Sequence, residues 1–305
     1  MQFLKEVNFN FIGSRYYGGV ISIILIVISL VSLILRGGPN YGIDFKGGAS
    51  LRLRFENPIS VGEIRDVLSE IGQGNSEIKQ MGQSTEYLIR IQESVEIGDI
   101  SDQFLAELSE KLADNSYELL GKDTVGPRIG SELRDAAIWA ILASLGLIML
   151  YISWRFEFKF AVGAVIALFH DVIITLGAFS VLNLEISLAI VAAFLTIVGY
   201  SLNDTIVVFD RIRENLKIMR RESYELIFNK SINQTLSRTV LTSITTLIVV
   251  LILFFFGGEV IHNFSFAMLI GILIGTYSSI FVASPFVVEW HLRQQKNKGK
   301  NTQRK

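Results

Sequence analysis

The sequence contains no cysteine, only three histidines and four prolines, and 19% charged residues. Without cysteine the chain has no disulfide framework, no thiolate metal site and no cysteine nucleophile, and the redox compartment stays undefined. Charged residues make up about a quarter of an ordinary soluble domain, whereas 50% of this chain is hydrophobic. A net charge of −1 gives no reason to expect a bulk polyanion as partner. The composition indicates a membrane protein.

Six apolar runs are long enough to cross the roughly 30 Å hydrocarbon core, which takes about 20 helical residues. A segment of ordinary polarity, residues 36–135, separates the first run from the second, and the other connections are short. The sequence therefore predicts a polytopic α-helical membrane protein with one large domain outside the bilayer. The predicted spans are residues 17–35, 136–153, 160–182, 186–209, 239–256 and 264–288.

Lysine and arginine in the short segments predict the orientation, because cytoplasmic loops carry an excess of both. The arm 1–16, the loop between the second and third spans, the segment 210–238 and the tail 289–305 are all basic. The loops 183–185 and 257–263 contain neither lysine nor arginine. We therefore expect the protein in the inner (plasma) membrane of its cell. Both termini should lie in the cytoplasm, and residues 36–135 should lie outside.

The external segment has the pattern of a small α+β domain. Strands are predicted at 49–55, 76–81, 86–92 and 117–125, and helices at 60–71 and 99–113, with Ser60 and Glu63 forming a capping box. The order βαββαβ is that of the ferredoxin-like fold. Acidic residues outnumber basic ones and histidine is absent, so the domain offers no metal cluster or catalytic set. We interpret it as a binding or gating module.

Several polar side chains lie inside the predicted spans, where each costs at least about 2.5–3.5 kcal/mol if charged. Asp171, next to His170, is near the middle of the third span. Asp204 follows Asn203 in the fourth span, one turn after Tyr200. Arg238 opens the fifth span and precedes a hydroxyl stripe that consists of Thr242, Thr245 and Thr246.

Each of these residues has a structural alternative. Arg238 could extend to the cytoplasmic headgroups, and either aspartate could serve as a hydrogen-bonding group between helices. Two acids, a histidine and an arginine on different spans of one bundle favour proton coupling. Small residues are expected at close helix contacts, namely Gly163, Gly177, Gly199, Gly271 and Gly275.

Two motifs resemble a known family, the protein-export membrane proteins SecD and SecF. Residues 41–48, Y-G-I-D-F-K-G-G, resemble its G-I-D-F-x-G-G motif. Residues 199–215, G-Y-S-L-N-D-T-I-V-V-F-D-R-I-R-E-N, resemble the fourth-span motif of the SecF branch more than that of the SecD branch. The segments His170–Val172 and Arg238–Ser243 are similar as well, and the resemblance covers nearly the whole chain.

The resemblance implies a fold like half of a resistance-nodulation-division transporter, completed by SecD. It implies a subunit that uses the proton-motive force to complete preprotein export through the SecYEG channel, after the SecA step, with YajC as a further partner. The external domain would engage the preprotein. The site residues that it implies are Asp204 and Arg238 for proton coupling, with Asp171 a weaker candidate; Asn203, Tyr200, His170 and Thr242 in support; and Gly42, Asp44, Phe45, Gly47 and Gly48 in the motif after the first span.

Two alternatives stay open at this point. One is half of a proton-driven transporter of small molecules or lipids, and the other is a structural translocase subunit that moves no protons. No nucleophile–base set, phosphate loop or metal-ligand spacing is present in the sequence. We therefore expect neither an enzyme nor a cofactor, and no nucleic-acid partner.

Overall fold

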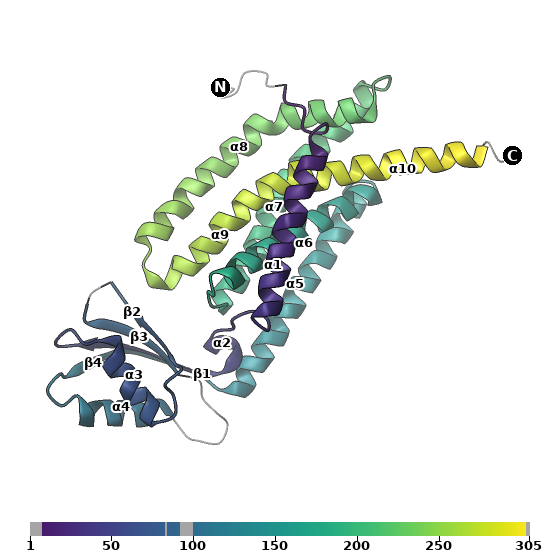
Figure 1. The fold of residues 1–305 in the computed structure, drawn as a ribbon. Coiled ribbons are helices and arrows are strands. Elements are labelled where there is room, and N and C mark those ends of the chain that lie inside the picture. The colour runs from purple at the N-terminus through teal and green to yellow at the C-terminus, as the bar shows by residue number, and fades with distance from the viewer. Residues whose placement is uncertain (1–7, 83, 92–99, 303–305) are drawn as a thin grey trace. The chain divides into compact units, whose positions relative to one another are not determined.

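A computed structural model describes residues 8–82, 84–91 and 100–302, which form two compact units (Figure 1). We call them the membrane unit and the small unit. The membrane unit comprises Met1–Asn40, Ile141–Leu184 and Ala189–Lys305, and the small unit comprises Tyr41–Ala140 and Glu185–Leu188. The chain thus crosses between the units four times, and the short segment 185–188 belongs to the small unit although long helices flank it.

Within the described residues, six helical segments are long and apolar enough to span a membrane, which confirms the predicted fold class. The last of them, Ile261–Asn297, is continuous but contains a π-helical turn. The segments are α1 (Arg15–Leu35), α5 (Pro127–Arg155), α6 (Phe158–Val181), α7 (Leu188–Ile218), α8 (Tyr224–Phe256), and the succession α9 (Glu259–Ser278), η1 (Ser279–Ala283) and α10 (Ser284–Thr302).

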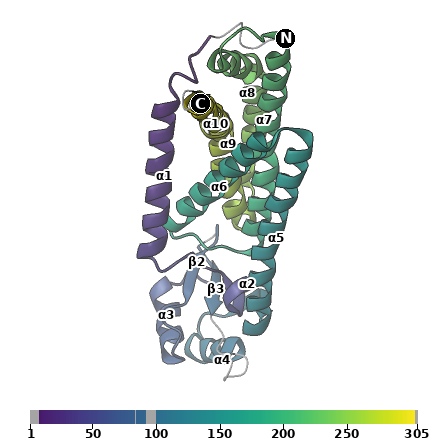
Figure 2. The same cartoon turned by 90° about the vertical axis from the view of Figure 1, so that its right-hand side faces the viewer.

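Helix α6 lies at the centre of the membrane unit. It packs against α1, α9 and η1, while α8 packs along α9 (Figures 1 and 2). Aromatic side chains fill the space between α6, α7 and α8, with the rings of Phe160 and Phe209 4.9 Å apart and Phe228 stacked on Phe160. By contrast α1, α5 and α8 keep long apolar faces exposed.

The last membrane helix changes direction between α9 and α10 (Figure 1). Helix α10 directly follows the π-helical turn η1. Pro285 lies in the first turn of α10 and has no N–H to donate. The hydroxyl of Ser284 donates to the carbonyl of Ser279 at 2.9 Å, five residues earlier. Proline and π-turns are the usual causes of helix kinks, and both are present here.

The small unit contains a four-stranded antiparallel sheet in the order β2-β3-β1-β4, which is the ferredoxin-like order. Helices α3 and α4 cover one face of it (Figure 1). The predicted strand end Gln92 and helix start Asp99 lie outside the described residues, as do the ends of the predicted terminal arms. The elements are α2 (Ile43–Lys46), β1 (Gly48–Phe55), α3 (Val61–Glu70), β2 (Glu77–Gln80), β3 (Glu86–Ile91), α4 (Ile100–Lys111) and β4 (Tyr117–Val125).

The alternation in β1 places every second side chain in the core of the small unit, as the sequence pattern predicts. Leu51 and Leu53 are fully buried against Phe104 of α4 and residues of α3. The capping box at the start of α3 is present: Ser60 accepts from the backbone of Glu63, whose side chain accepts from the backbone of Ser60.

The helices extend well beyond the apolar runs in the sequence. α5 begins at Pro127, α7 continues to Ile218 and α8 begins at Tyr224. The added turns are polar or amphipathic, because the apolar requirement applies only where a helix is inside the hydrocarbon core. The segment 210–238 is therefore largely helical rather than a loop.

Candidate functional site

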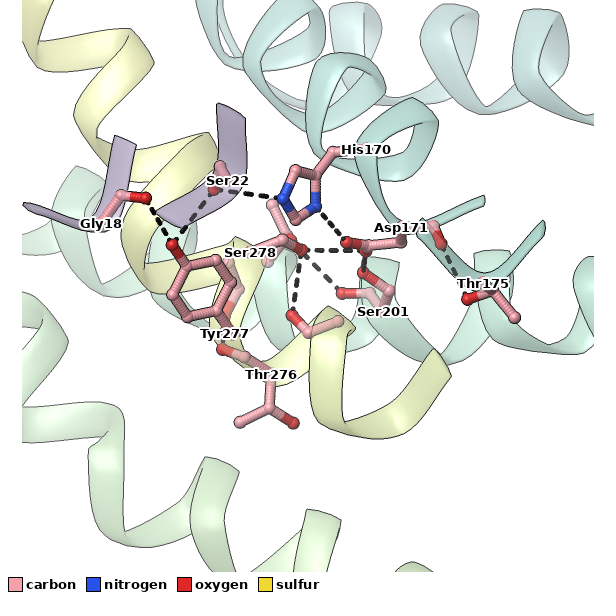
Figure 3. Close-up of polar contacts among 12 residues, drawn as sticks. Gly18, Ser22, His170, Asp171, Thr175, Ser201, Thr276, Tyr277 and Ser278 are labelled. Atoms are coloured by element: carbon pink, nitrogen blue, oxygen red, sulfur yellow. Dashed lines mark hydrogen bonds and ion pairs between the residues drawn. The ribbon is translucent and has the colours of Figure 1, made fainter. Parts of the chain in front are cut away.

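Asp171 on α6 is a buried carboxylate with a complete set of partners (Figure 3). Its Oδ1 lies 2.9 Å from Nδ1 of His170, and its Oδ2 accepts from Ser201 at 2.6 Å and from Ser278 at 2.8 Å. Only 1% of Asp171 is exposed. Because a buried charge or carboxyl group is costly without partners, these bonds offset its desolvation and join α6 to α7 and α9.

His170 extends this network to α1. Its Nε2 lies 3.1 Å from the hydroxyl of Ser22, which lies 3.1 Å from the hydroxyl of Tyr277 (Figure 3). Tyr277 in turn donates to the carbonyl of Gly18 at 2.6 Å. A continuous row of exchangeable protons therefore runs from the Asp171 carboxylate to the α1 backbone.

Asp204 on α7 is equally buried, with 2% exposed, but it is held more loosely. The hydroxyls of Ser243 on α8 and Thr276 on α9 both lie 3.5 Å from its Oδ2, beyond the range of a strong hydrogen bond. These hydroxyls are only 2.7 Å from each other. The site therefore leaves this carboxylate free to change partner or to take up a proton.

Arg238 on α8 interacts electrostatically with Asp204. Its side chain is exposed, and among the described residues we find no ion pair or hydrogen bond of its guanidinium group. The structure thus places the cation near the carboxylate but without direct contact.

Of the predicted supporting residues, Tyr200 makes hydrogen bonds between helices near Asp204, whereas the side chains of Thr242 and Asn203 make none to another helix within the described residues. Tyr200 donates to the carbonyl of Thr242 at 2.9 Å and to Thr246 at 3.1 Å, so it joins α7 to α8 beside Asp204. The hydroxyl of Thr242 stays on its own helix and donates to the carbonyls of Arg238 and Thr239. Asn203 is exposed, whereas Asp204, the next residue, is buried.

Sequence reasoning missed the hydroxyl groups that complete both sites. One signal was present: Ser201 lies one turn before Asp204, and residues 276–279 form a polar run in an otherwise apolar span. The missed residues are Ser22, Ser201, Ser243, Thr276, Tyr277 and Ser278.

The two carboxylate sites lie next to each other because α9 packs closely against α7. A Cβ on Gly275 would lie 2.8 Å from the Cβ of Ser201, so α9 can approach α7 this closely only with glycine there. The π-turn η1 begins directly after Ser278, and such turns are frequent at functional sites. Among the described residues no group of histidines and acids could hold a metal ion.

Comparison with known proteins identifies the family. Residues 105–293 match the SecD/SecF C-terminal family of protein export membrane proteins, and residues 32–59 match the SecD/SecF GG motif. The translocase subunit SecF of Desulfurispirillum indicum is 49% identical over 95% of this chain and 94% of its own length. The chain belongs to the SecD/SecF family.

Solved structures of this family agree with the fold. The crystal structure of SecDF from Thermus thermophilus superimposes with a TM-score of 0.84 at 43% identity, covering 94% of this chain and 39% of that one. SecDF in a super-membrane-facing form gives a TM-score of 0.74 at 41% identity, covering 99% of this chain and 41% of that one. The chain thus spans about two-fifths of the length of these SecDF chains, and matches the SecF relatives over almost their whole length.

Proposed function

We propose that this SecD/SecF family member is a proton-driven subunit of the protein translocase rather than an enzyme. With SecD it would use the proton-motive force to help complete preprotein export through SecYEG after the SecA step, with YajC as a further partner. The observation that carries the proposal is Asp204, which is buried, weakly bonded and within electrostatic reach of Arg238. A carboxylate that alternates between a proton and a cation can couple proton passage to helix movement.

Asp171 has a different role in this proposal. Three short hydrogen bonds fix its carboxylate, whereas the two bonds to Asp204 are both 3.5 Å long. A group that must gain and lose a proton in each cycle is better served by the weaker set of bonds. Asp171 and His170 would therefore hold α1, α6, α7 and α9 together around the site where Asp204 titrates.

The exposed polar side chains near Asp204 support a partner subunit. Arg238 and Asn203 are exposed on α8 and α7, among apolar residues such as Leu241 and Ile244. A charged group facing hydrocarbon costs at least about 2.5–3.5 kcal/mol. Since the chain matches only 39% of a SecDF chain, the remainder of such a protein would supply the cover. We therefore assign this face to contact with SecD.

The test is preprotein release from inverted vesicles after ATP-driven insertion, with and without a proton gradient. In Asp204→Asn the volume and most hydrogen bonding are kept while the titratable group is lost. We expect the gradient to stimulate release by the parent but not by this variant. Asp210→Asn is the matched control, since Asp210 lies on the same helix, is 40% exposed and pairs with Arg155 at 3.1 Å.

Assembly with SecD is checked in both variants by co-purification. Equal stimulation of the parent and of Asp204→Asn would contradict the proposal and favour a subunit that only holds the translocase together. Gradient-driven efflux of dyes in place of preprotein release would favour a small-molecule transporter.

A further inference from the structure

The GG motif, Gly42–Gly48, lies where the chain crosses between the two units, and neither carboxylate site accounts for it. It begins two residues after the first crossing, at 40/41. Within the small unit it contacts the two other segments that lead to the membrane helices α5 and α7. These segments are residues 127–130, at the start of α5, and residues 185–188, directly before and at the start of α7.

The contacts with segment 185–188 end at the first residue of α7. Tyr41 and Ile186 form a parallel bridge, and the N–H of Gly42 donates to the carbonyl of Ile186 at 3.0 Å. The Oδ2 of Asp44 accepts from the N–H of Leu188 at 2.8 Å. The first N–H groups of a helix lack intrahelical partners, and a carboxylate there also interacts favourably with the helix dipole. Asp44 therefore caps α7 from outside that helix.

The contacts with α5 are between backbones, which explains the glycines. Gly47 has φ +80°, in the left-handed region, and a Cβ on it would lie 2.6 Å from the Cα of Pro127. A Cβ on Gly130 would lie 3.0 Å from the backbone of both Phe45 and Gly47. A side chain at either glycine would force the motif away from the start of α5.

An ion-pair cluster fixes segment 185–188 to the sheet as well. Arg90 on β3 pairs with Glu77 on β2 at 3.0 Å and with Glu185. Both Arg90 and Glu185 are largely shielded, with 27% and 17% of their side chains exposed. The segment is thus bonded to the motif on one side and to the sheet on the other.

We propose that the GG motif is the joint that holds the first residues of α5 and α7 to the small unit, with Asp44 as the positioning residue for α7. Helix α7 carries Asp204, sixteen residues after Leu188 and so about 24 Å along one continuous helix. A displacement of α7 linked to proton uptake at Asp204 would be transmitted through this joint to the small unit. A displacement of the small unit would be transmitted to α7 in the same way. This inference rests on the proposed function, because it gives the joint a role in proton coupling.

The test compares three variants of the full chain in its complex with SecD. Asp44→Ala removes the cap, Asp44→Asn keeps a good capping oxygen without the charge, and Ser223→Ala is the matched control. Ser223 caps α8, where its hydroxyl accepts from the N–H of Leu226 at 3.2 Å. For each variant we would measure amide hydrogen exchange in the first turn of α7 and the gradient-dependent part of preprotein release.

We expect Asp44→Ala to speed exchange at Leu188 severalfold and to remove most of the gradient-dependent release, with the complex still assembled. Asp44→Asn should keep both near the parent values, and Ser223→Ala should change neither. If Asp44→Ala speeds exchange but leaves the gradient response unchanged, the cap is local and the inference is wrong. If Asp44→Asn restores slow exchange at Leu188 but loses as much release as Asp44→Ala, the cap does not carry the coupling, which also overturns the inference.

A covalent substitute for the cap gives a second test, which the absence of cysteine makes clean. Tyr41 and Ile186 are bridge partners, and such neighbours lie about 4.8 Å apart, within the Cα range for a disulfide. Tyr41→Cys with Ile186→Cys, added to Asp44→Ala, should restore gradient-dependent release when oxidised but not when reduced. The same disulfide is also formed in a chain that keeps Asp44. If it inhibits gradient-dependent release there, the joint must open during the cycle, contrary to the proposal.

The two proposals fail in different ways. A normal gradient response in Asp204→Asn would refute the proton-coupling function whatever Asp44 does. A lost response in Asp204→Asn together with a normal response in Asp44→Ala would leave the function standing and refute only the joint.

Discussion

Glu185 is a partly buried acid whose protonation affects the stability of the small unit. It lies outside the membrane helices, in the segment before α7, where it meets Arg90, Glu77 and the charge of Lys46. Burial, together with the hydrogen bond to Glu77, raises the pKa of Glu185 to about 8, against the opposing charge of Arg90. Despite its own burial, the pKa of Glu77 is lowered by the hydrogen bond to Glu185 and by Arg90. Of the two acids, Glu185 is therefore the one that keeps its proton to the higher pH.

The raised pKa of Glu185 predicts a pH-dependent stability. Between the ordinary glutamate pKa of 4.5 and about 8, the folded protein keeps a proton that the unfolded chain has released. The contribution of Glu185 to stability is therefore fully present below pH 4.5 and is lost as the pH rises through about 8. Glu185→Gln imitates the protonated form, so its unfolding midpoint in detergent should decline less than that of the parent over this window.

Thermal unfolding at pH 5.5 and 8.5, followed by tryptophan fluorescence, would measure the difference. Glu118→Gln is the control, since Glu118 is 68% exposed and pairs with the exposed Arg54 at 3.4 Å. Parallel decline of the parent and Glu185→Gln would show that Glu185 does not carry the dependence.

At the scale of helices, small residues set the distances on which both carboxylate sites depend. Gly177 on α6 meets Ser29 on α1 so closely that a Cβ there would lie 2.7 Å from the Ser29 Cα. One turn further along, the hydroxyls of Ser32 and Ser180 are 2.8 Å apart. This contact keeps α1 beside α6, where Ser22 reaches His170. Small residues at such positions allow the backbones of membrane helices to approach.

Gly177→Leu should separate α1 from α6. Overpacking of a tight contact costs about 1–3 kcal/mol, so we expect a lower midpoint of thermal unfolding in detergent. Gly146→Leu is the matched control, because a Cβ on Gly146 meets no atom within 4 Å. If both variants unfold at the same temperature, the separation of α1 from α6 does not lower the stability of the protein.

Sequence patterns predicted the elements better than the contacts between them. Period-two alternation located β1 and β3 to within a residue or two, because one face of each strand is buried. The spans were found, but not the polar turns of α7 and α8 beyond them, since hydropathy responds only to the part in hydrocarbon.

The carboxylates Asp171 and Asp204 were evident in the sequence because acids are costly in an apolar span. Their hydroxyl partners, such as Ser278 for Asp171 and Ser243 for Asp204, were not, because a serine is inexpensive in a membrane helix and its contacts depend on how the helices are rotated. Rotation also explains why Asn203 is exposed while Asp204, the next residue on α7, is buried. Adjacent positions on a helix point about 100° apart.

At the scale of the whole molecule, the distribution of charge predicts one orientation in the membrane. The arm, the segment that connects α7 to α8 and the tail are basic, whereas the short connections at 183–185 and 257–263 contain neither lysine nor arginine. All short segments agree with cytoplasmic termini and with the small unit outside. The proposed proton coupling at Asp204 assumes this orientation, because the gradient would drive protons from the outside inward.

Single cysteines in this cysteine-free chain would measure the orientation directly. Ser69→Cys, on the exposed side of α3, should react with a membrane-impermeant maleimide added to intact spheroplasts. Glu222→Cys, between α7 and α8, should react only after the membrane is permeabilised, because the basic segment around it stays in the cytoplasm. Ser201→Cys is the control for burial, since Ser201 is 1% exposed and should stay unlabelled in both conditions. Labelling of Glu222→Cys before Ser69→Cys would reverse the predicted topology, and with it the direction of proton entry in the proposed function.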